Sequence, residues 1–146
     1  KTQKDVKVLC KDIHADYAES FKHFFEKEFN RSIKWITHGI NSEDFSKDKY
    51  ILLFNVQSRI PEDIQHTLTN FKIQERRLEK NLLFVAMHRS DSMKCYTVYQ
   101  FIGTPEHKLH PFSLVNIFYS EKFVFDENNR QQAREKIEHF LFSQVQ

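Results

Sequence analysis

The chain has 146 residues, which is the length of one domain with a sizeable apolar core. Its 22 Lys and Arg against 20 Asp and Glu give a net charge of only +2, which argues against a dedicated nucleic-acid-binding domain. No apolar run is long enough to cross a bilayer, so we expect no membrane association, and 15 Phe and 5 Tyr favour an ordered core over disorder.

The first residue and the cysteines bear on the cellular setting. Because the chain begins with Lys1 rather than Met, we expect residues 1–146 to be a single domain excised from a longer protein, or else a trimmed product. No secretory signal is recognised at its start. Cys10 and Cys95 are too few for a disulfide framework, so we expect two free thiols in a reducing, cytoplasmic compartment.

The first part of the chain alternates between strand and helix patterns. Residues 6–10 predict a strand, and Asp12 or Asp16 is expected to cap the helix that follows. That helix has an apolar stripe at helical spacing, formed by Ala18, Phe21, Phe25 and Phe29. Residues 33–37 predict an amphipathic strand near a sheet edge. The polar residues 39–49 that follow are few for a parallel crossover and count against this arrangement.

The centre of the chain indicates a sheet that is covered on both faces. Residues 50–56 and 82–87 are apolar without polar alternation, which is typical of parallel strands between two helical layers. Pro61 suits the first position of a helix, since its missing N–H would be unpaired there in any case. The buried face of that helix is expected to comprise Ile64, Leu68 and Phe71.

The last third predicts further strands and a closing helix. Residues 96–102 are a candidate extra strand, 114–119 the last long strand, and 123–125 a short extension. Asp126 or Asn129 is expected to cap the final helix. The apolar stripe of that helix is Ala133, Ile137, Phe140 and Leu141. The whole pattern predicts a single three-layer α/β domain with about five mainly parallel strands.

Several kinds of chemistry have no motif in this chain. With only Gly39 and Gly103, the sequence contains neither a phosphate-binding Walker loop nor a dinucleotide fingerprint, and we expect no cofactor. His107 and His110 lack a third spaced ligand, so no metal site is expected. Cys10 has a histidine four positions later, but a buried, unreactive thiol is the favoured interpretation.

Polar side chains do gather where the predicted strands end. In a parallel sheet these ends share one edge, where α/β folds bind ligands. The candidate ligand-binding residues are Asp12, His14, Asn55, Ser58, Arg59, His88 and Arg89. Arg59 or Arg89 would supply a cation for an anionic ligand, and Glu62 or Asp63 is the candidate catalytic carboxylate. The alternative interpretation is the ordinary polarity of surface loops.

Two resemblances follow from these segments. The sequences YILLFNVQSRIPEDI (50–64) and NLLFVAMH (81–88) resemble a group of uncharacterised vertebrate proteins, notably from fish, which implies no particular function. The order of elements resembles flavodoxin-like folds, including TIR-type signalling domains and nucleoside deoxyribosyltransferase-like enzymes. In NAD-cleaving TIR domains a glutamate on the helix after the third strand does the chemistry, and Glu62 stands near that place without the surrounding aromatic and Ser/Cys pattern.

The sequence therefore leads to two functional hypotheses of different classes. The preferred one is a cytosolic, non-catalytic protein-interaction module, in signalling or innate immunity, that binds a protein partner. The alternative is an enzyme that binds or cleaves nucleotides, such as a hydrolase or transferase acting on NAD or nucleosides, with its site at the carboxyl ends of the strands.

Overall fold

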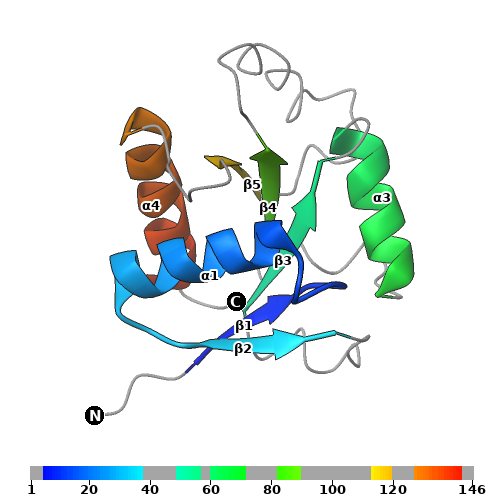
Figure 1. The fold of residues 1–146 in the computed structure, drawn as a ribbon, viewed down its shortest axis with the longest axis horizontal. Coiled ribbons are helices and arrows are strands. Elements are labelled where there is room, and N and C mark those ends of the chain that lie inside the picture. Colours follow the sequence, from blue (N-terminus) through cyan, green and yellow to red (C-terminus); the bar gives the residue numbers. More distant parts are fainter. Residues whose placement is uncertain are drawn as a thin grey trace.

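A computed structural model of the protein describes residues 5–37, 49–56, 60–71, 82–89, 113–119 and 127–142 (Figure 1). The strands are β1 (Val6–Leu9), β2 (Ile33–Ile36), β3 (Tyr50–Asn55), β4 (Leu82–Arg89) and β5 (Ser113–Tyr119). The helices are α1 (Asp16–Phe29), α3 (Ile60–Asn70) and α4 (Glu127–Phe142). The candidate strands at 96–102 and 123–125 lie outside the described residues.

The five strands form one sheet in the order β2-β1-β3-β4-β5, and all neighbouring strands are parallel. This confirms the predicted α/β class and gives the strand order of a flavodoxin-like, three-layer fold. The amphipathic strand β2 lies at an edge, as its pattern predicted. The order also places β1 between β2 and β3, so the chain returns across one intervening strand.

The short stretch between β2 and β3 was expected to argue against a parallel arrangement, and that expectation is wrong. Residues 37–49 separate the two strands, and an extended chain of that length reaches about 40 Å. Returning along a strand of β3's length requires about 20 Å, and crossing two strand spacings requires about 10 Å. The chain is therefore long enough to make the crossover without a full helix.

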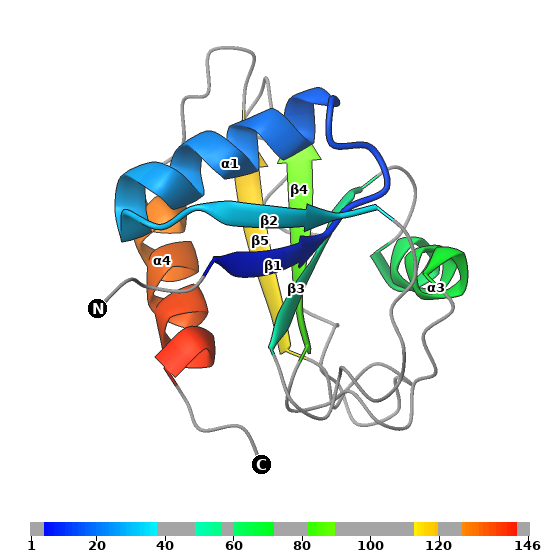
Figure 2. The same ribbon diagram turned by 90° about the horizontal axis from the view of Figure 1, so that it is seen from below.

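Alternate residues of the central strands belong to two separate apolar clusters, one on each face of the sheet. Ile51 and Leu53 of β3 pack toward α1 and α4, whereas Leu52 and Phe54 pack toward α3. Figure 2 shows the same division, with α1 and α4 on one side of the sheet and α3 on the other. Because both faces are covered, β3 and β4 need apolar side chains at almost every position.

Helix α1 contributes phenylalanines to the first cluster. Phe21 and Phe25 are fully buried, and successive ring centroids along the helix lie 5.7 Å apart for Phe21–Phe25 and 4.9 Å apart for Phe25–Phe29. The helix ends at Asn30, whose backbone is left-handed (φ 52°) and whose N–H donates to the carbonyl of Glu26. An asparagine suits this position because its short polar side chain tolerates the left-handed region.

Neither predicted aspartate caps α1. The residue at the cap position is Ala15, which makes no side-chain capping hydrogen bond, and Asp16 is the first residue inside the helix. Asp12 instead accepts a hydrogen bond from the backbone N–H of His14, at 3.1 Å, in the turn before the helix. An aspartate readily forms such a local turn, which competes with capping.

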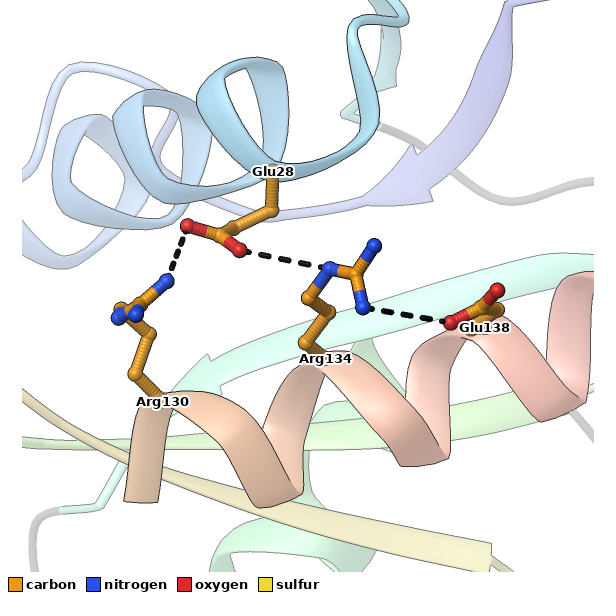
Figure 3. A network of polar contacts seen from close by, with 4 residues as sticks. All are labelled: Glu28, Arg130, Arg134 and Glu138. Atoms are coloured by element: carbon orange, nitrogen blue, oxygen red, sulfur yellow. Dashed lines mark hydrogen bonds and ion pairs between the residues drawn. The ribbon is translucent and has the colours of Figure 1, made fainter. Parts of the chain in front are cut away.

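A charged network joins α1 to α4 (Figure 3). Glu28, whose side chain is only 10% exposed, accepts a hydrogen bond from Arg130 at 2.6 Å and lies 3.4 Å from Nε of Arg134. Arg134 also contacts Glu138 one turn further along α4, at 3.6 Å. A carboxylate this buried would be costly without a cation, so the two arginines make the close approach of the helices tolerable.

A second link joins the start of β3 to the end of α4. The ammonium of Lys49 donates to the backbone carbonyls of Phe140 and Leu141, at 2.7 and 3.3 Å. It also lies 5.6 Å from the centroid of the Phe140 ring. A cation at this end satisfies terminal carbonyl groups and interacts favourably with the helix dipole.

Two element boundaries differ from the prediction. Strand β4 continues through His88 and Arg89, which were assigned to the loop after it, because both residues remain paired with β5. Helix α4 begins at Glu127, so Asn129 lies within its first turn and is not its cap. The other candidate cap, Asp126, lies outside the described residues.

Removing part of the core tests the central position of β3. Leu53 is 1% exposed, and its replacement by alanine should lower the free energy of unfolding by about 2–5 kcal/mol, through lost burial and a residual cavity. Denaturant melts measure this change, with Lys34→Ala on the exposed side of β2 as the control. A loss below about 1 kcal/mol would show that Leu53 is not in a close-packed core.

Candidate functional site at the carboxyl edge of the sheet

The carboxyl edge of the sheet is where the predicted site residues fall. In this strand order the topological switch lies between β1 and β3, beside the loop that leads into α1. Asp12 and His14 lie in that loop and are exposed, and Asn55 ends β3 and is half-buried. Ser58 and Arg59 follow β3 outside the described residues.

The sheet divides the predicted residues into two groups. Asn55 and Arg89 lie two positions after Leu53 and Met87, and therefore on the same α1 face of the sheet. His88 lies two positions after Ala86 and therefore on the α3 face, where Phe84 and Ala86 pack. The described candidates thus lie along the expected edge, Asn55 and Arg89 toward the α1 face and His88 toward the α3 face.

On the α1 face, Arg89 binds the beginning of α1. Its guanidinium donates to the carboxylate of Asp16 at 2.9 Å, joining the end of β4 to the first residue of the helix. The side chains are 38% and 73% exposed, so we expect this ion pair to contribute little to stability. Asp16 also places negative charge at the positive end of the helix dipole.

Two partly buried polar contacts lie on the same face of the sheet. The Cys10 thiol donates to the hydroxyl of Tyr17 at 3.6 Å, and the hydroxyl of Tyr119 donates to the side-chain oxygen of Asn55 at 3.3 Å. Burial raises the pKa of the Cys10 thiol, although the Tyr17 contact opposes the shift. Burial is also the main reason that the pKa of Tyr17 is raised. Cys10 is therefore a protonated thiol at neutral pH, the opposite of an activated nucleophile.

On the α3 face, His88 belongs to a small polar and aromatic cluster. Its Nε2 lies 2.9 Å from the side-chain oxygen of Asn116, and its ring stacks on Phe118 with centroids 4.6 Å apart. His88 is 3% exposed, and burial lowers its pKa, although the hydrogen bond to Asn116 opposes this shift. A neutral imidazole whose Nε2 donates to Asn116 satisfies this geometry.

The candidate carboxylates lie at the start of α3. Glu62 is exposed and Asp63 is half-buried. Both lie in the first turn, where a negative charge interacts favourably with the helix dipole. The carbonyl of Asp63 accepts a hydrogen bond from the hydroxyl of Thr67 at 2.7 Å. At this position the two carboxylates are as well placed to stabilise the start of α3 as to act as catalytic groups.

Sequence reasoning missed the residues that hold this edge together. Tyr17, Asn116 and Tyr119 were not singled out, although each contacts a residue that was. The only available signal was a polar group within a strongly apolar strand, as with Asn116 in the middle of β5, or at its end, as with Tyr119. Such a group needs a hydrogen-bond partner once the strand is buried.

Within the described ranges, no three His, Cys, Asp or Glu side chains gather as metal ligands would. The helices of the described part of the chain are all too short or too polar to cross a membrane. Comparison with protein-family models, curated proteins and solved structures finds no match for the chain. The resemblances noted in the sequence therefore stay predictions.

The buried imidazole predicts a pH-dependent stability. The unfolded chain binds a proton at His88 near pH 6.5, whereas the folded protein binds it only at lower pH, so stability should fall as the pH drops below about 6.5. The slope from this one residue is at most about 1.4 kcal/mol per pH unit. Urea melts of the wild type and of His88→Gln across pH 4.5–8 isolate it; identical pH profiles would contradict the prediction.

The buried thiol predicts slow native labelling. In a Cys95→Ser variant, Cys10 should react with a thiol reagent much more slowly in the native state than in urea, because it is 0% exposed and its thiolate is disfavoured. Thiol counting in urea without reductant should recover one free thiol. Equally fast labelling with and without urea would show that Cys10 is accessible.

Proposed function

We propose that this domain is a non-catalytic protein-interaction module. The observation that carries the proposal is that polar side chains at the carboxyl edge bind one another: Arg89 with Asp16, Asn55 with Tyr119, and His88 with Asn116. In an enzyme, acid–base groups at this edge are expected to have pKa values tuned toward neutrality and to converge on a substrate. Here the histidine is held neutral and the thiol is held protonated.

The exposed polar residues on the α1 side of this edge are the proposed binding surface. Asp12, His14 and Lys11 in the β1–α1 loop are exposed, and they lie next in sequence to the helix start that carries the Arg89–Asp16 pair. The surface thus presents charges of both signs on a rigid sheet and helix. Mixed charge of this kind favours orientation and selection of a protein partner over simple attraction to a polyanion.

A role in signalling or innate immunity within the cytoplasm is part of the proposal. It is supported by the TIR-like order of elements and by a cysteine content that suits a reducing compartment. A charge-reversed pair tests the surface itself. The double variant Asp16→Arg, Arg89→Asp keeps the ion pair but exchanges the positions of its two charges. We therefore expect it to fold, and we expect the set of proteins that it binds to differ from the set that the wild type binds. Identical capture by both forms would place the binding surface elsewhere.

The nucleotide-handling enzyme remains the second candidate, because this strand order places a ligand-binding switch point between β1 and β3. Arg59 would be its cation, since a guanidinium can hold a phosphate or carboxylate with two hydrogen bonds. Glu62, in the first turn of the next helix, opposes this by repelling a second anion.

Calorimetry discriminates between the two functions. With NAD, ATP and nucleoside monophosphates, we expect binding weaker than roughly 0.1 mM, equivalent to less than about 5 kcal/mol. The control is Arg59→Ala, which should leave that weak, salt-sensitive binding nearly unchanged. Micromolar binding by the wild type that is lost in Arg59→Ala would make the enzyme the better assignment.

A further inference from the structure

The outer edge of β5 is occupied by a side chain from α4. Of the strands that the structure describes, β5 is the last in the sheet, and the carbonyl of Asn116 and the N–H of Phe118 bond to α4. Asn129, in the first turn of α4, accepts a hydrogen bond from the N–H of Phe118 at 3.0 Å. It also donates its own amide N–H to the carbonyl of Asn116 at 2.7 Å.

These two hydrogen bonds reproduce those of a neighbouring strand. In a parallel ladder, one partner residue donates its N–H to the carbonyl of residue i−1 and accepts from the N–H of residue i+1. Asn129 satisfies the same two groups around Ile117 with one primary amide. The backbone positions that an added strand would use at the centre of this edge are therefore already filled.

The two edges of the sheet differ in how much protection they need. β2 has four residues and carries an exposed lysine, Lys34, and both features discourage strand addition. β5 has seven residues, Ser-Leu-Val-Asn-Ile-Phe-Tyr, with no charge and several strong strand formers. A long, uncharged edge strand is the kind that pairs with other chains.

We propose that the Asn129 side chain blocks the edge of β5 and so keeps β5 from pairing with β5 of a second copy of this chain. Two copies related by a two-fold axis would present the same edge to each other, so their strands would run antiparallel. Because β5 carries no charge, such pairing sets no like charges opposite each other. Without the amide, the carbonyl of Asn116 and the N–H of Phe118 become available to that second strand.

The test is the mass of Asn129→Ala in solution as a function of concentration. We expect its weight-average mass, measured by sedimentation or light scattering, to rise toward twice that of the wild type over concentrations at which the wild-type mass stays constant. If Asn129→Ala does not fold, Asn129→Ser takes its place, because a serine suits the first turn but its hydroxyl is too short to bridge both backbone groups.

A matched control separates edge opening from general destabilisation. Ala133→Gly lies one turn along the same helix at a buried position, so it weakens α4 while leaving the Asn129 amide in place. It should show the wild-type concentration dependence. A constant mass for Asn129→Ala, or an equal rise for Ala133→Gly, would overturn the proposal.

Discussion

The constraint on which this structure depends is the burial of one parallel sheet on both faces. β3 and β4 have no exposed side chain except at their carboxyl ends, so each residue must fit a helix or a neighbouring strand on its own side. Burying an aliphatic or aromatic side chain contributes about 1.5–3 kcal/mol, and these strands supply many such side chains. The helices are placed by that requirement: α1 and α4 on one face, α3 on the other.

The same constraint governs the polar groups at the carboxyl edge. A hydrogen-bonding group that is drawn into a dry interface needs a partner, and His88, Asn55 and Cys10 each have one. Their partners come from β5 and α1, the elements that close over them. The arrangement stabilises the protonated thiol of Cys10 and the neutral imidazole of His88, because burial raises the pKa of the first and lowers the pKa of the second.

The sequence predicted what depends on apolar periodicity. The unbroken apolar runs predicted β3 and β4, and the Phe21–Phe25–Phe29 stripe predicted α1. The amphipathic pattern predicted the edge position of β2. The prediction from sequence failed where one polar side chain can form hydrogen bonds with any of several backbone groups. Asn129 fits a helix cap as well as a strand edge, and Asp12 fits a cap as well as a local turn, so only the packed structure decides. The pairing of His88 with Asn116 joins residues 28 positions apart, which no local pattern reveals.

The contact between Lys49 and the end of α4 has a consequence for the order of folding during synthesis. Its two residues are 91 positions apart in the chain, and the contact fastens the start of the central strand to the last described helix. The sheet itself is built entirely from parallel, non-local pairings, which close slowly because long loops must form first. β1 and β3 leave the ribosome well before α4 can cover their α1-side face. During that interval the apolar residues of β3 depend on transient shielding, so translation speed between β3 and α4 should influence the yield of folded protein.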